Sequence, residues 1–321
     1  GSFAGFDLAK PQADAIALPT GQHCVGAIGS GSLGGVKQLG DKVLMICVHI
    51  LSDTLHQRII QPLVVLLDKV YVCVMDFKVF IDGEAGTTGL KVAERLQAHP
   101  HVQILRVDEA ERKNAAARTD MMAASDVTIL CLPDEAAVGA VTLAQASQTR
   151  LIDASSAHRI DPDWVYGFAE LQPGQRDAIA NGKLITNPGC YPTGFLALVR
   201  PLIASGLLSD TALICAPAVS GYSGGGKAMI TKHDAGDLHP AFSYGSNLQH
   251  KHLGEMTLYS GLKTPPIFMP SVGDFYAGML VHLPLHADQI KGSATAAMIY
   301  DCLADWYHGS ALVRMAAAAA N

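Results

Sequence analysis

From about residue 75 onward, short runs of hydrophobic residues alternate with alanine-rich stretches. The runs predict strands at 78–81, 102–107, 127–132 and 151–153. The intervening stretches predict helices at 90–98, 112–124 and 135–147. Strands that alternate with helices are typical of a parallel sheet, because a parallel pair needs a crossover connection. This region is therefore predicted to be an α/β fold with an open, doubly wound parallel sheet.

The alternation loosens from about residue 189. The pattern predicts helices at 196–204 and 294–307, strand-like pieces at 212–218, 266–272 and 278–285, and a Gly-rich loop at 220–226. This composition predicts a second α+β domain with a more antiparallel sheet. Before residue 75 no period of 2 or 3.6 persists. We therefore expect an N-terminal extension at 1–74, a first domain at 75–188 and a second domain at 189–321.

Composition narrows the function classes. Of 321 residues, 49% are hydrophobic and 16% charged, and 23 basic against 29 acidic residues give a net charge of −6. This balance argues against a nucleic-acid or anionic-membrane partner, which would need a concentrated basic face. The apolar runs at 43–51 and 59–75 are too short or too interrupted to span a membrane.

The cysteines and the first residues indicate a reduced, cytoplasmic location. Seven cysteines are scattered without a CxxC pair, so we expect neither a disulfide framework nor a metal site. The first 21 residues lack the basic and apolar regions of a secretory signal.

Two glycine patterns compete for a dinucleotide site. Gly29 to Gly34 matches GxGxxG literally but lacks the strand before it and the helix after it. Gly83, Gly86 and Gly89, with Thr87 and Thr88 between them, follow a predicted strand and precede an amphipathic helix. There the glycines permit close backbone approach and the helix N-terminus offers free N–H groups to a pyrophosphate. We favour this second loop over a purely structural turn.

The residues alone do not decide which group would bind the cofactor at its 2′ position. Asp108 lies about 20 residues after the glycines, where an acid would accept the ribose hydroxyls of NAD. Arg112 and Lys113 follow at once, and either could bind the 2′-phosphate of NADP.

Cys190 is the candidate nucleophile. It lies in Asn-Pro-Gly-Cys-Tyr-Pro-Thr, where a turn precedes the cysteine and a helix follows, beginning near Thr193. A helix N-terminus lowers the pKa of a thiol, so we expect a pKa below the ~8.5 of a free cysteine and first labelling by iodoacetamide. The alternative is a buried structural cysteine. His250-Lys-His252, with Glu255 beyond, offers imidazoles as acid or base.

Two further loops are candidates for anion contacts. Ser220 and the Gly-rich run from Gly221 to Lys227, which includes Gly224, could hold anionic oxygens through backbone N–H groups and the lysine. Asp-Ala-Ser155-Ser-Ala-His-Arg159 follows a strand end, where ligands bind in open α/β sheets.

From Lys78 to about residue 310 the chain resembles the N-acetyl-γ-glutamyl-phosphate reductases, in their shorter bacterial subtype within the semialdehyde dehydrogenase superfamily. The matching segments are KVFIDGEAGTTGL, ILCLPD, DASSAHR, VYGFAEL, TNPGCYPTG, SGYSGGGKAMI, LQHKH and PPIFMPSVGDFYAGMLVHLPLH. The resemblance implies a Rossmann-like dinucleotide-binding domain at 75–188 and a catalytic and dimerisation domain at 189–321. It also implies NADP as cofactor, a small-molecule substrate and a homo-oligomer.

The resemblance further implies a mechanism. Cys190 would attack the acyl phosphate to form a thioester, which a hydride from NADPH reduces, and His250, rather than His252, would be the acid/base. The cofactor contacts would be Gly83, Gly86, Thr87, Thr88, Gly89, Arg112, Ser155, Gly224 and Lys227. Substrate contacts would be Arg159, Ser220 and His252.

Two departures from the family qualify this hypothesis. Residues 1–74 match nothing in it, and we expect them to add little to function. A late segment that returns to the nucleotide domain is expected to be missing, and Gly254 stands where proline is usual. A reductase of aspartyl phosphate and an inactive nucleotide-binding relic are the alternatives.

Overall fold

The computed structural model describes residues 77–292 and 295–316, and before them the backbone of five short strands. These strands are Phe6–Asp7 (β1), Lys37–Gln38 (β2), Val43–Val48 (β3), Gln61–Leu66 (β4) and Lys69–Val72 (β5). Strands β2 to β5 form an antiparallel sheet in sequential order. Strands β3 and β4 fall on the two apolar runs. The Gly29–Gly34 pattern lies outside the described residues.

The chain divides into two compact units. One comprises Gly1–Lys10, Lys78–Ala98 and Ile104–Asn321, and the other comprises Pro11–Phe77 and His99–Gln103. Strand β1 pairs antiparallel with Arg314–Met315 (β16), and both belong to the first unit. The following paragraphs concern that unit.

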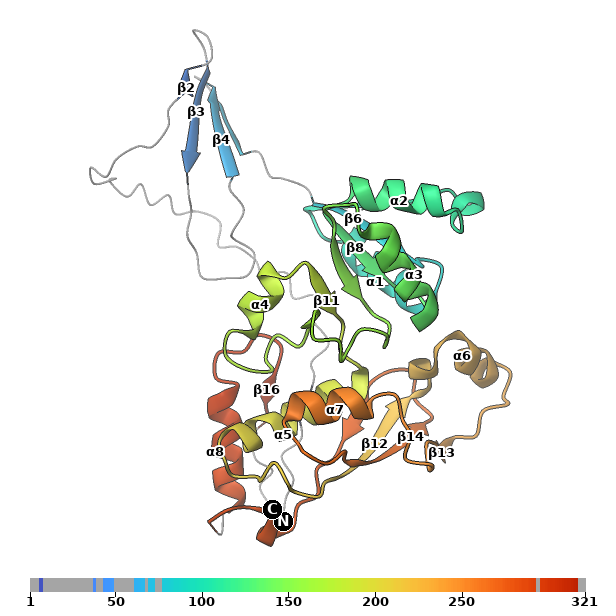
Figure 1. Cartoon of the computed structure of the whole chain (residues 1–321), viewed down its shortest axis with the longest axis vertical. Coiled ribbons are helices and arrows are strands. Elements are labelled where there is room, and N and C mark those ends of the chain that lie inside the picture. The colour runs from blue at the N-terminus through green and yellow to red at the C-terminus, as the bar shows by residue number, and fades with distance from the viewer. Residues whose placement is uncertain are drawn as a thin grey trace, which may run out of the picture. The chain divides into compact units, whose positions relative to one another are not determined.

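A six-stranded sheet forms the first half of this unit. The strands are Phe77–Asp82 (β6), Val102–Leu105 (β7), Val127–Leu130 (β8), Arg150–Asp153 (β9), Val165–Tyr166 (β10) and Leu184–Thr186 (β11). Their order is β10-β11-β9-β8-β6-β7, and the pairs from β10 to β6 are all parallel (Figure 1). The predicted doubly wound parallel sheet is confirmed. Sequence analysis missed β10 and β11, because two or three residues are too few to show a pattern.

Helices Thr87–Gln97 (α1), Ala115–Ala124 (α2), Asp134–Ala144 (α3) and Gln175–Asn181 (α4) accompany this sheet. Helix α1 begins three residues before its predicted start. The helix predicted from 112 begins at 115, since a short 3-10 turn, Glu109–Glu111 (η1), precedes it and Asn114 caps α2. The core beneath these helices consists of Phe80, Met122, Leu130, Ala140, Ala144, Leu151 and Trp164.

The second half is built on a mixed four-stranded sheet. Its strands are Cys215–Gly221 (β12), Ala241–Ser243 (β13), Ile267–Gly273 (β14) and Met279–Val281 (β15), in the order β13-β14-β12-β15. Strands β12 and β14 are parallel, and the other two pairs are antiparallel. The expected more antiparallel sheet is therefore present, although its longest pair is parallel.

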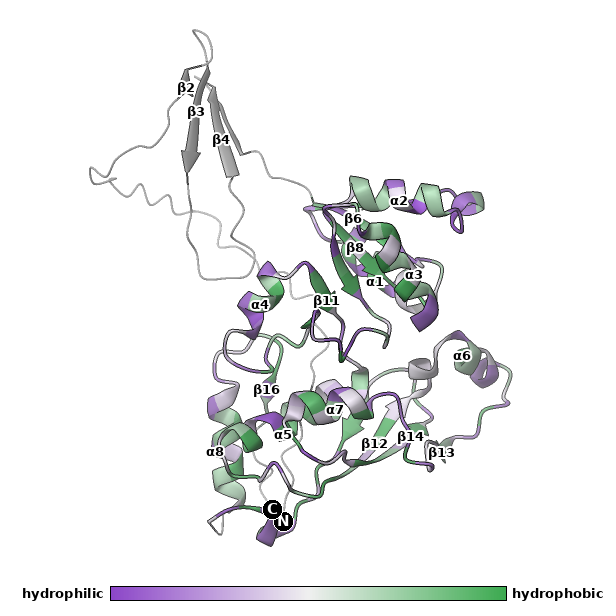
Figure 2. Cartoon of the chain, viewed as in Figure 1, coloured by the Kyte–Doolittle hydropathy of each residue, from purple (hydrophilic) through white to green (hydrophobic). Residues whose placement is uncertain are grey.

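Helix Cys190–Ala204 (α5) lies at the centre of this half (Figure 1). It is joined by Gly226–Asp234 (α6), Leu253–Ser260 (α7) and Ala296–Trp306 (α8), of which α6 and α7 were not predicted. Phe195, Leu196 and Val199 of α5 are fully buried in the larger of two hydrophobic cores. Figure 2 shows hydrophobic colouring along the central strands and hydrophilic residues on α4 and α6.

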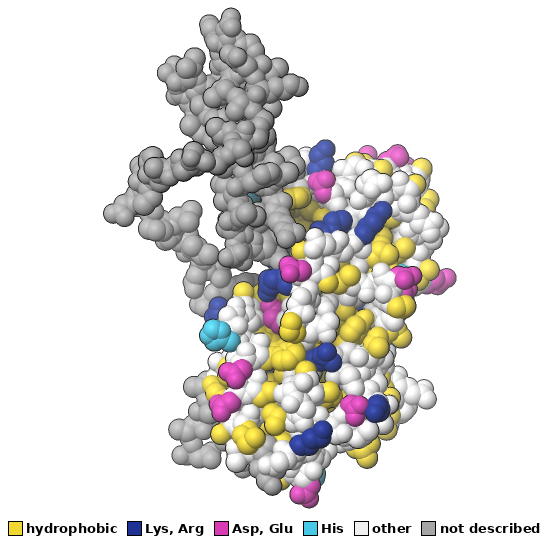
Figure 3. All heavy atoms as spheres, turned by 60° about the vertical axis from the view of Figure 1, so that its left-hand side comes forward, with side chains coloured by type: hydrophobic (Ala, Val, Ile, Leu, Met, Phe, Trp, Pro, Cys, Tyr) yellow, Lys and Arg dark blue, Asp and Glu magenta, His cyan; other side chains and the backbone are white. Residues whose placement is uncertain are grey.

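The surface mixes charge types. On the face drawn in Figure 3, Lys and Arg side chains lie interspersed with Asp and Glu and with small hydrophobic areas. Among the described residues, no helix combines the length and the apolar character that crossing a membrane requires.

Candidate active site

Cys190 is the first residue of helix α5. Strand β11 ends at Thr186, the turn Asn187-Pro188-Gly189 follows, and Gly189 is the N-cap of the helix. The cysteine is a free, exposed thiol. The sequence-based prediction of a sulfur at a helix N-terminus agrees with this geometry, although the helix begins three residues before Thr193.

The expected direction of the Cys190 pKa shift is wrong. Although Cys190 is exposed at its surface, the surrounding protein desolvates the thiolate, and this burial raises the pKa of the thiol above its ordinary 9.0. The backbone N–H of Tyr191 and the Arg159 guanidinium act in the opposite direction but do not compensate. The thiol is thus the resting form at neutral pH, and a base must take its proton.

Glu255 of α7 holds the turn before Cys190. Its Oε2 accepts hydrogen bonds from the Gly189 N–H at 2.9 Å and the Tyr166 hydroxyl at 2.7 Å, and its Oε1 accepts one from Arg159 Nη1 at 2.9 Å. The glutamate is 1% exposed. A buried carboxylate needs such a full set of partners. Sequence analysis gave Glu255 no role, and because α7 was not predicted either, no local signal indicated that this acid is buried.

Gly189 has no room for a side chain. A Cβ there would lie 2.5 Å from Glu255 Oε1 and 2.8 Å from both Arg159 Nη1 and His252 Nε2. Glycine is therefore required at this position. The same contacts show that Arg159, His252 and Glu255 converge on the residue before the nucleophile.

The two histidines differ in burial and in availability for proton transfer. His252 is buried, and burial, His250 and Arg159 lower its pKa to about 3. His250 is half-buried, its pKa is lowered by burial and by Lys251, and its ring lies 4.6 Å from that of His252. Both imidazoles are neutral at pH 7. His250 is the better proton acceptor, because its charged form is penalised less.

Tyr244 links His250 to the cysteine. Its ring lies 5.8 Å from the His250 ring. Burial, and after it the neighbouring Tyr191 and Cys190 groups, raise the pKa of the Tyr244 phenol, which places that phenol near the sulfur. Ser220, at the end of β12, lies beside Tyr191 in the same cluster.

The loop after β9 brings Arg159 to the site. Asp153 accepts hydrogen bonds from the Ser155 hydroxyl and N–H at 2.7 and 2.8 Å, and its Oδ2 lies 2.6 Å from His158 Nδ1. Arg159 also donates to the Ala154 carbonyl at 3.1 Å. The loop thus fixes the buried guanidinium beside Cys190. The Ser155 hydroxyl serves the loop itself, and its predicted cofactor contact stays a prediction.

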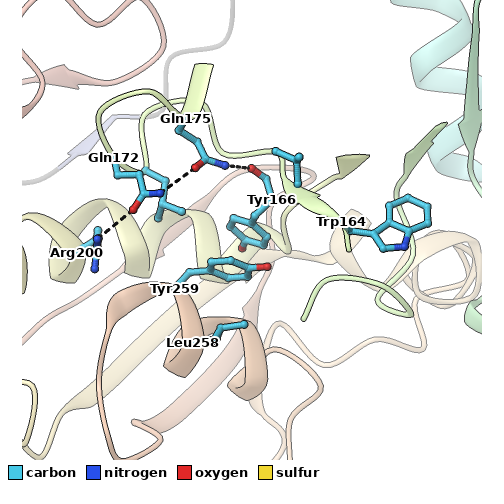
Figure 4. Close-up of a pocket in the computed structure, with 9 residues that line it drawn as sticks. Trp164, Tyr166, Gln172, Gln175, Arg200, Leu258 and Tyr259 are labelled. Carbon is cyan, nitrogen blue, oxygen red and sulfur yellow. Dashed lines mark hydrogen bonds between the residues drawn. The ribbon is translucent and has the colours of Figure 1, made fainter. Parts of the chain in front are cut away.

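A cavity of about 350 Å³ is lined by Tyr166, whose hydroxyl binds Glu255, and by Tyr259. The Tyr166 and Tyr259 rings stack at 3.8 Å in its wall, and a chain of hydrogen bonds runs from Arg200 through Gln172 and Gln175 to the Tyr166 carbonyl (Figure 4). The Tyr259 hydroxyl donates to the Arg159 carbonyl at 2.8 Å. One tyrosine of this stacked pair therefore binds the Glu255 carboxylate, and the other binds the backbone of Arg159.

Close packing requires the first and last glycines of the first loop. Gly83 has φ +89°, and a Cβ there would overlap the Cys131 carbonyl oxygen. A Cβ on Gly89 would overlap the Gly83 carbonyl oxygen. Gly86 is the N-cap of α1, which has no side-chain cap, so its first N–H groups are available to a ligand. Thr87 begins α1 and Thr88 is exposed beside it.

The second Gly-rich run is mostly regular structure and not the loop predicted at 220–226. Strand β12 continues to Gly221, a 3-10 turn spans Tyr222–Gly225 (η2), and α6 begins at Gly226. Gly224 and Lys227 are exposed at this corner. Lys91 of α1 lies 4.4 Å over the Tyr276 ring, whose backbone supports η2, so the two Gly-rich segments approach each other.

Residues 78–181 match the family described as semialdehyde dehydrogenase, NAD binding domain, and residues 190–321 match its dimerisation domain. Over 247 residues, 74% of the chain, it is 47% identical to the N-acetyl-gamma-glutamyl-phosphate reductase of Trichormus variabilis, covering 77% of that protein. It is also 47% identical to the same enzyme of Brucella anthropi, covering 79%.

A solved structure of a probable aspartate-semialdehyde dehydrogenase from Pseudomonas aeruginosa has the same fold, with a TM-score of 0.52 and 13% identity over 71% of this chain and 78% of that one. The fold and these matches define a semialdehyde dehydrogenase, an oxidoreductase with a nicotinamide cofactor. Within that class, the chain belongs to the N-acetyl-γ-glutamyl-phosphate reductases. The resemblance drawn from the sequence motifs is confirmed.

Proposed function

We propose that this chain reduces N-acetyl-γ-glutamyl phosphate to N-acetylglutamate semialdehyde with NADPH, releasing phosphate, as a step of arginine biosynthesis. The observation that carries this proposal is the position of Cys190 at the start of α5, with Arg159, Glu255 and His252 gathered at Gly189. The His250 ring lies beside that of His252. The relatives bear the corresponding name.

Cys190 performs the covalent step. Once its proton is removed, the thiolate attacks the γ-carbonyl carbon; a C–S bond forms, the C–O bond to phosphate breaks, and phosphate leaves with the electron pair. The first N–H groups of α5 and the Arg159 charge stabilise the thiolate. The buried Glu255 network keeps the Gly189 turn fixed, so the sulfur is presented in one position.

His250 exchanges protons with the reacting atoms. Because its pKa lies below the ordinary 6.5, it is a neutral base at working pH and can take the proton of the thiol. The nicotinamide cofactor, when bound, supplies a hydride to the acyl carbon of the thioester. His250 then donates the proton it took from the thiol to the oxygen as the thiohemiacetal forms and takes that proton back as the C–S bond breaks. The aldehyde is released, and the electron pair of the broken bond returns to the sulfur as a thiolate.

Anionic groups of the substrate would contact the groups around Gly189. Arg159 is buried, and in the described part of the chain its Nε has no hydrogen-bond partner. A buried guanidinium N–H without a partner favours an anionic ligand. Ser220 and the buried His252 are the further substrate contacts that we propose.

The residues around the first Gly-rich loop fit a dinucleotide. Gly83, Gly86 and Gly89 leave the backbone open, and α1 offers its N-terminus to the pyrophosphate. Thr87, Thr88, Gly224 and Lys227 are the further contacts that we propose, and Arg112 is the basic group proposed from the sequence for NADP. The domain boundary near residue 188 and a cytoplasmic location stay predictions.

A homo-oligomer is supported by the outer face of the second sheet. Ile267 and Met269 of β14 and Leu280 of β15 are 51 to 59% exposed, and Leu213 is 74% exposed. Apolar residues gathered on one sheet face favour burial against a partner. We propose that a second copy of the chain covers this face, and sedimentation of the protein at several concentrations tests it.

The reaction is tested in reverse. With N-acetylglutamate semialdehyde, NADP and phosphate, the purified chain should raise the absorbance at 340 nm. Aspartate semialdehyde in the same assay should give at least about tenfold less, since a site shaped for one acyl chain loses binding energy with another. Equal rates would favour the aspartyl-phosphate alternative, and a folded protein that binds NADP without turnover would favour the relic.

A further inference from the structure

Arg106 lies where the two loops at the edge of the nucleotide-binding sheet meet. It directly follows β7, and Glu84 directly follows Gly83 of the first Gly-rich loop. Arg106 Nε donates to Glu84 Oε1 at 2.9 Å, with side-chain exposures of 51% and 26%. The end of the second strand of a β–α–β unit is the place where such folds read the 2′ position of the adenosine ribose.

The two arginines near this position differ in what they already bind. Arg112 donates through Nε to the Glu109 carbonyl and through Nη2 to the Glu109 carboxylate, both at 3.1 Å, so it is tied to its own 3-10 turn. Arg106 uses only Nε within the described ranges. Its two terminal nitrogens therefore present a free edge, the arrangement that binds a phosphate in bidentate fashion.

The ion pair with Glu84 affects how Arg106 would bind a phosphate. A carboxylate in the pyrophosphate loop would repel a 2′-phosphate nearby, and Arg106 neutralises it. The salt bridge also limits the rotamers of a long side chain, so less conformational entropy is lost when a phosphate binds. The exposed Asp108 carboxylate, four positions before Arg112, forms no ion pair within residues 77–292, whereas Glu84 and Glu109 each pair with an arginine.

Within the reductase proposed above, we propose that Arg106 selects NADP over NAD by contacting the 2′-phosphate, and that Glu84 positions Arg106 for this contact. Arg112, the basic residue singled out from the sequence, then contributes only to the general positive field. The inference concerns nucleotide selection alone, so it can be tested without catalysis.

The test is equilibrium binding of NADP, NAD, 2′-phospho-AMP and AMP to the full chain by calorimetry. Wild type should prefer the 2′-phosphorylated member of each pair. Arg106→Gln should weaken NADP and 2′-phospho-AMP by about 10- to 100-fold, the range for a lost charge-assisted contact, while NAD and AMP change little. Glu84→Gln should weaken NADP by a smaller factor. Arg95→Gln, an exposed arginine in the last turn of α1, is the matched control and should change NADP binding by less than about threefold. Arg112→Gln compares the two candidate arginines, and its loss of NADP binding should be smaller than that of Arg106→Gln.

Three results would overturn the inference. The first is a wild type that binds the nucleotides without a 2′-phosphate more tightly. The second is an equal loss of affinity for NADP and NAD in Arg106→Gln, and the third is a selective loss of affinity for NADP in Arg112→Gln. A thermal unfolding curve for each variant, unchanged from wild type, ensures that a loss reflects contact and not unfolding. If wild type binds NADP selectively through Arg106 yet reduces no acyl phosphate, the proposed function fails and this inference stands.

Discussion

The dinucleotide loop and the cysteine turn show two ways of building a site. The loop is contained between Gly83 and Gly89, and its first and last glycines are required by backbone atoms of the same loop or of the residue that follows β8. The cysteine turn depends on Glu255, which lies 66 positions from Gly189 in the chain and binds Arg159 and Tyr166, 96 and 89 positions away from it.

Because of this difference, a single substitution should have a different effect in each region. A substitution in the loop acts on backbone that the cofactor would approach. A substitution in the network around Cys190 acts through buried charges, where removing one partner leaves another without compensation. The two regions should therefore fail independently and with different signatures.

The largest effect is expected for Cys190→Ser. Turnover should fall by at least about 10⁴-fold, because an alcohol does not ionise at working pH and forms no thioester. NADP binding, measured by calorimetry, should be unchanged, since the loop from Gly83 to Gly89 is intact. Measurable turnover in this variant would identify another nucleophile, and Cys302→Ser provides the control for an uninvolved thiol.

Gly83→Ala should produce the reverse result. The new Cβ would overlap the Cys131 carbonyl oxygen, and the backbone has φ +89°, so the loop must shift. We expect NADP binding to weaken by about 100-fold, on the order expected when a loop is displaced by an ångström. Alkylation of Cys190 should proceed at the wild-type rate. Gly174→Ala, also at positive φ but with open space around it, controls for backbone strain alone. Nearly unchanged NADP binding in Gly83→Ala would contradict the role of this loop.

The same difference between local and long-range contacts decides which features could be predicted from the sequence. The order of strands and helices from 78 to 153 could be predicted, because hydrophobic period and glycine spacing are local properties. The cysteine motif was also local. The role of Glu255 could not be predicted, because nothing near it in the chain shows that it meets Gly189, Arg159 and Tyr166.

The direction of the Cys190 pKa was missed for a related reason. The helix N-terminus was visible in the sequence, whereas the burial that outweighs it comes from distant segments. Sequence analysis missed strands β10 and β11 and helix α7. Short elements without a regular hydrophobic pattern owe their structure to packing and not to propensity.

His250→Asn should lower kcat by about 10²-fold, the lower range for loss of a general base. Burial and Lys251 lower the His250 pKa, so the acidic limb of the wild-type kcat/KM profile should lie below pH 6.5. Lys251→Gln should move that limb to higher pH, because a positive neighbour that disfavours the imidazolium is removed. A limb that stays in His250→Asn would assign it to another group, and His252→Asn would then be compared.

Glu255→Gln should both destabilise the protein and make Cys190 easier to alkylate. Arg159 loses its buried partner, so the free energy of unfolding should fall by about 3 kcal/mol. The Glu255 charge raises the Cys190 pKa, and its removal should speed iodoacetamide labelling near pH 8. Turnover should nevertheless decrease, since the Gly189 turn loosens. Tyr166→Phe keeps the Glu255 charge, so it should neither speed labelling nor lower the free energy of unfolding comparably. Slower labelling in Glu255→Gln would contradict the proposed electrostatics.

The smallest effect is expected at Asp134, which begins α3 and holds the loop of Ser156. Burial alone would raise its pKa, but the Ser156 hydroxyl and N–H, which donate to it at 2.7 and 2.9 Å, lower the pKa overall. A carboxyl whose folded-state pKa is lowered stabilises the protein above its unfolded pKa of about 3.9, and this contribution is lost as pH falls through the folded value. Because the group is mostly solvated, Asp134→Asn should cost less than about 1 kcal/mol at pH 7. Urea unfolding from pH 7 to pH 3.5 should show the difference from wild type narrowing toward the acid end. A difference that is constant with pH would mean that the carboxylate charge contributes nothing and that only the shape of the side chain matters.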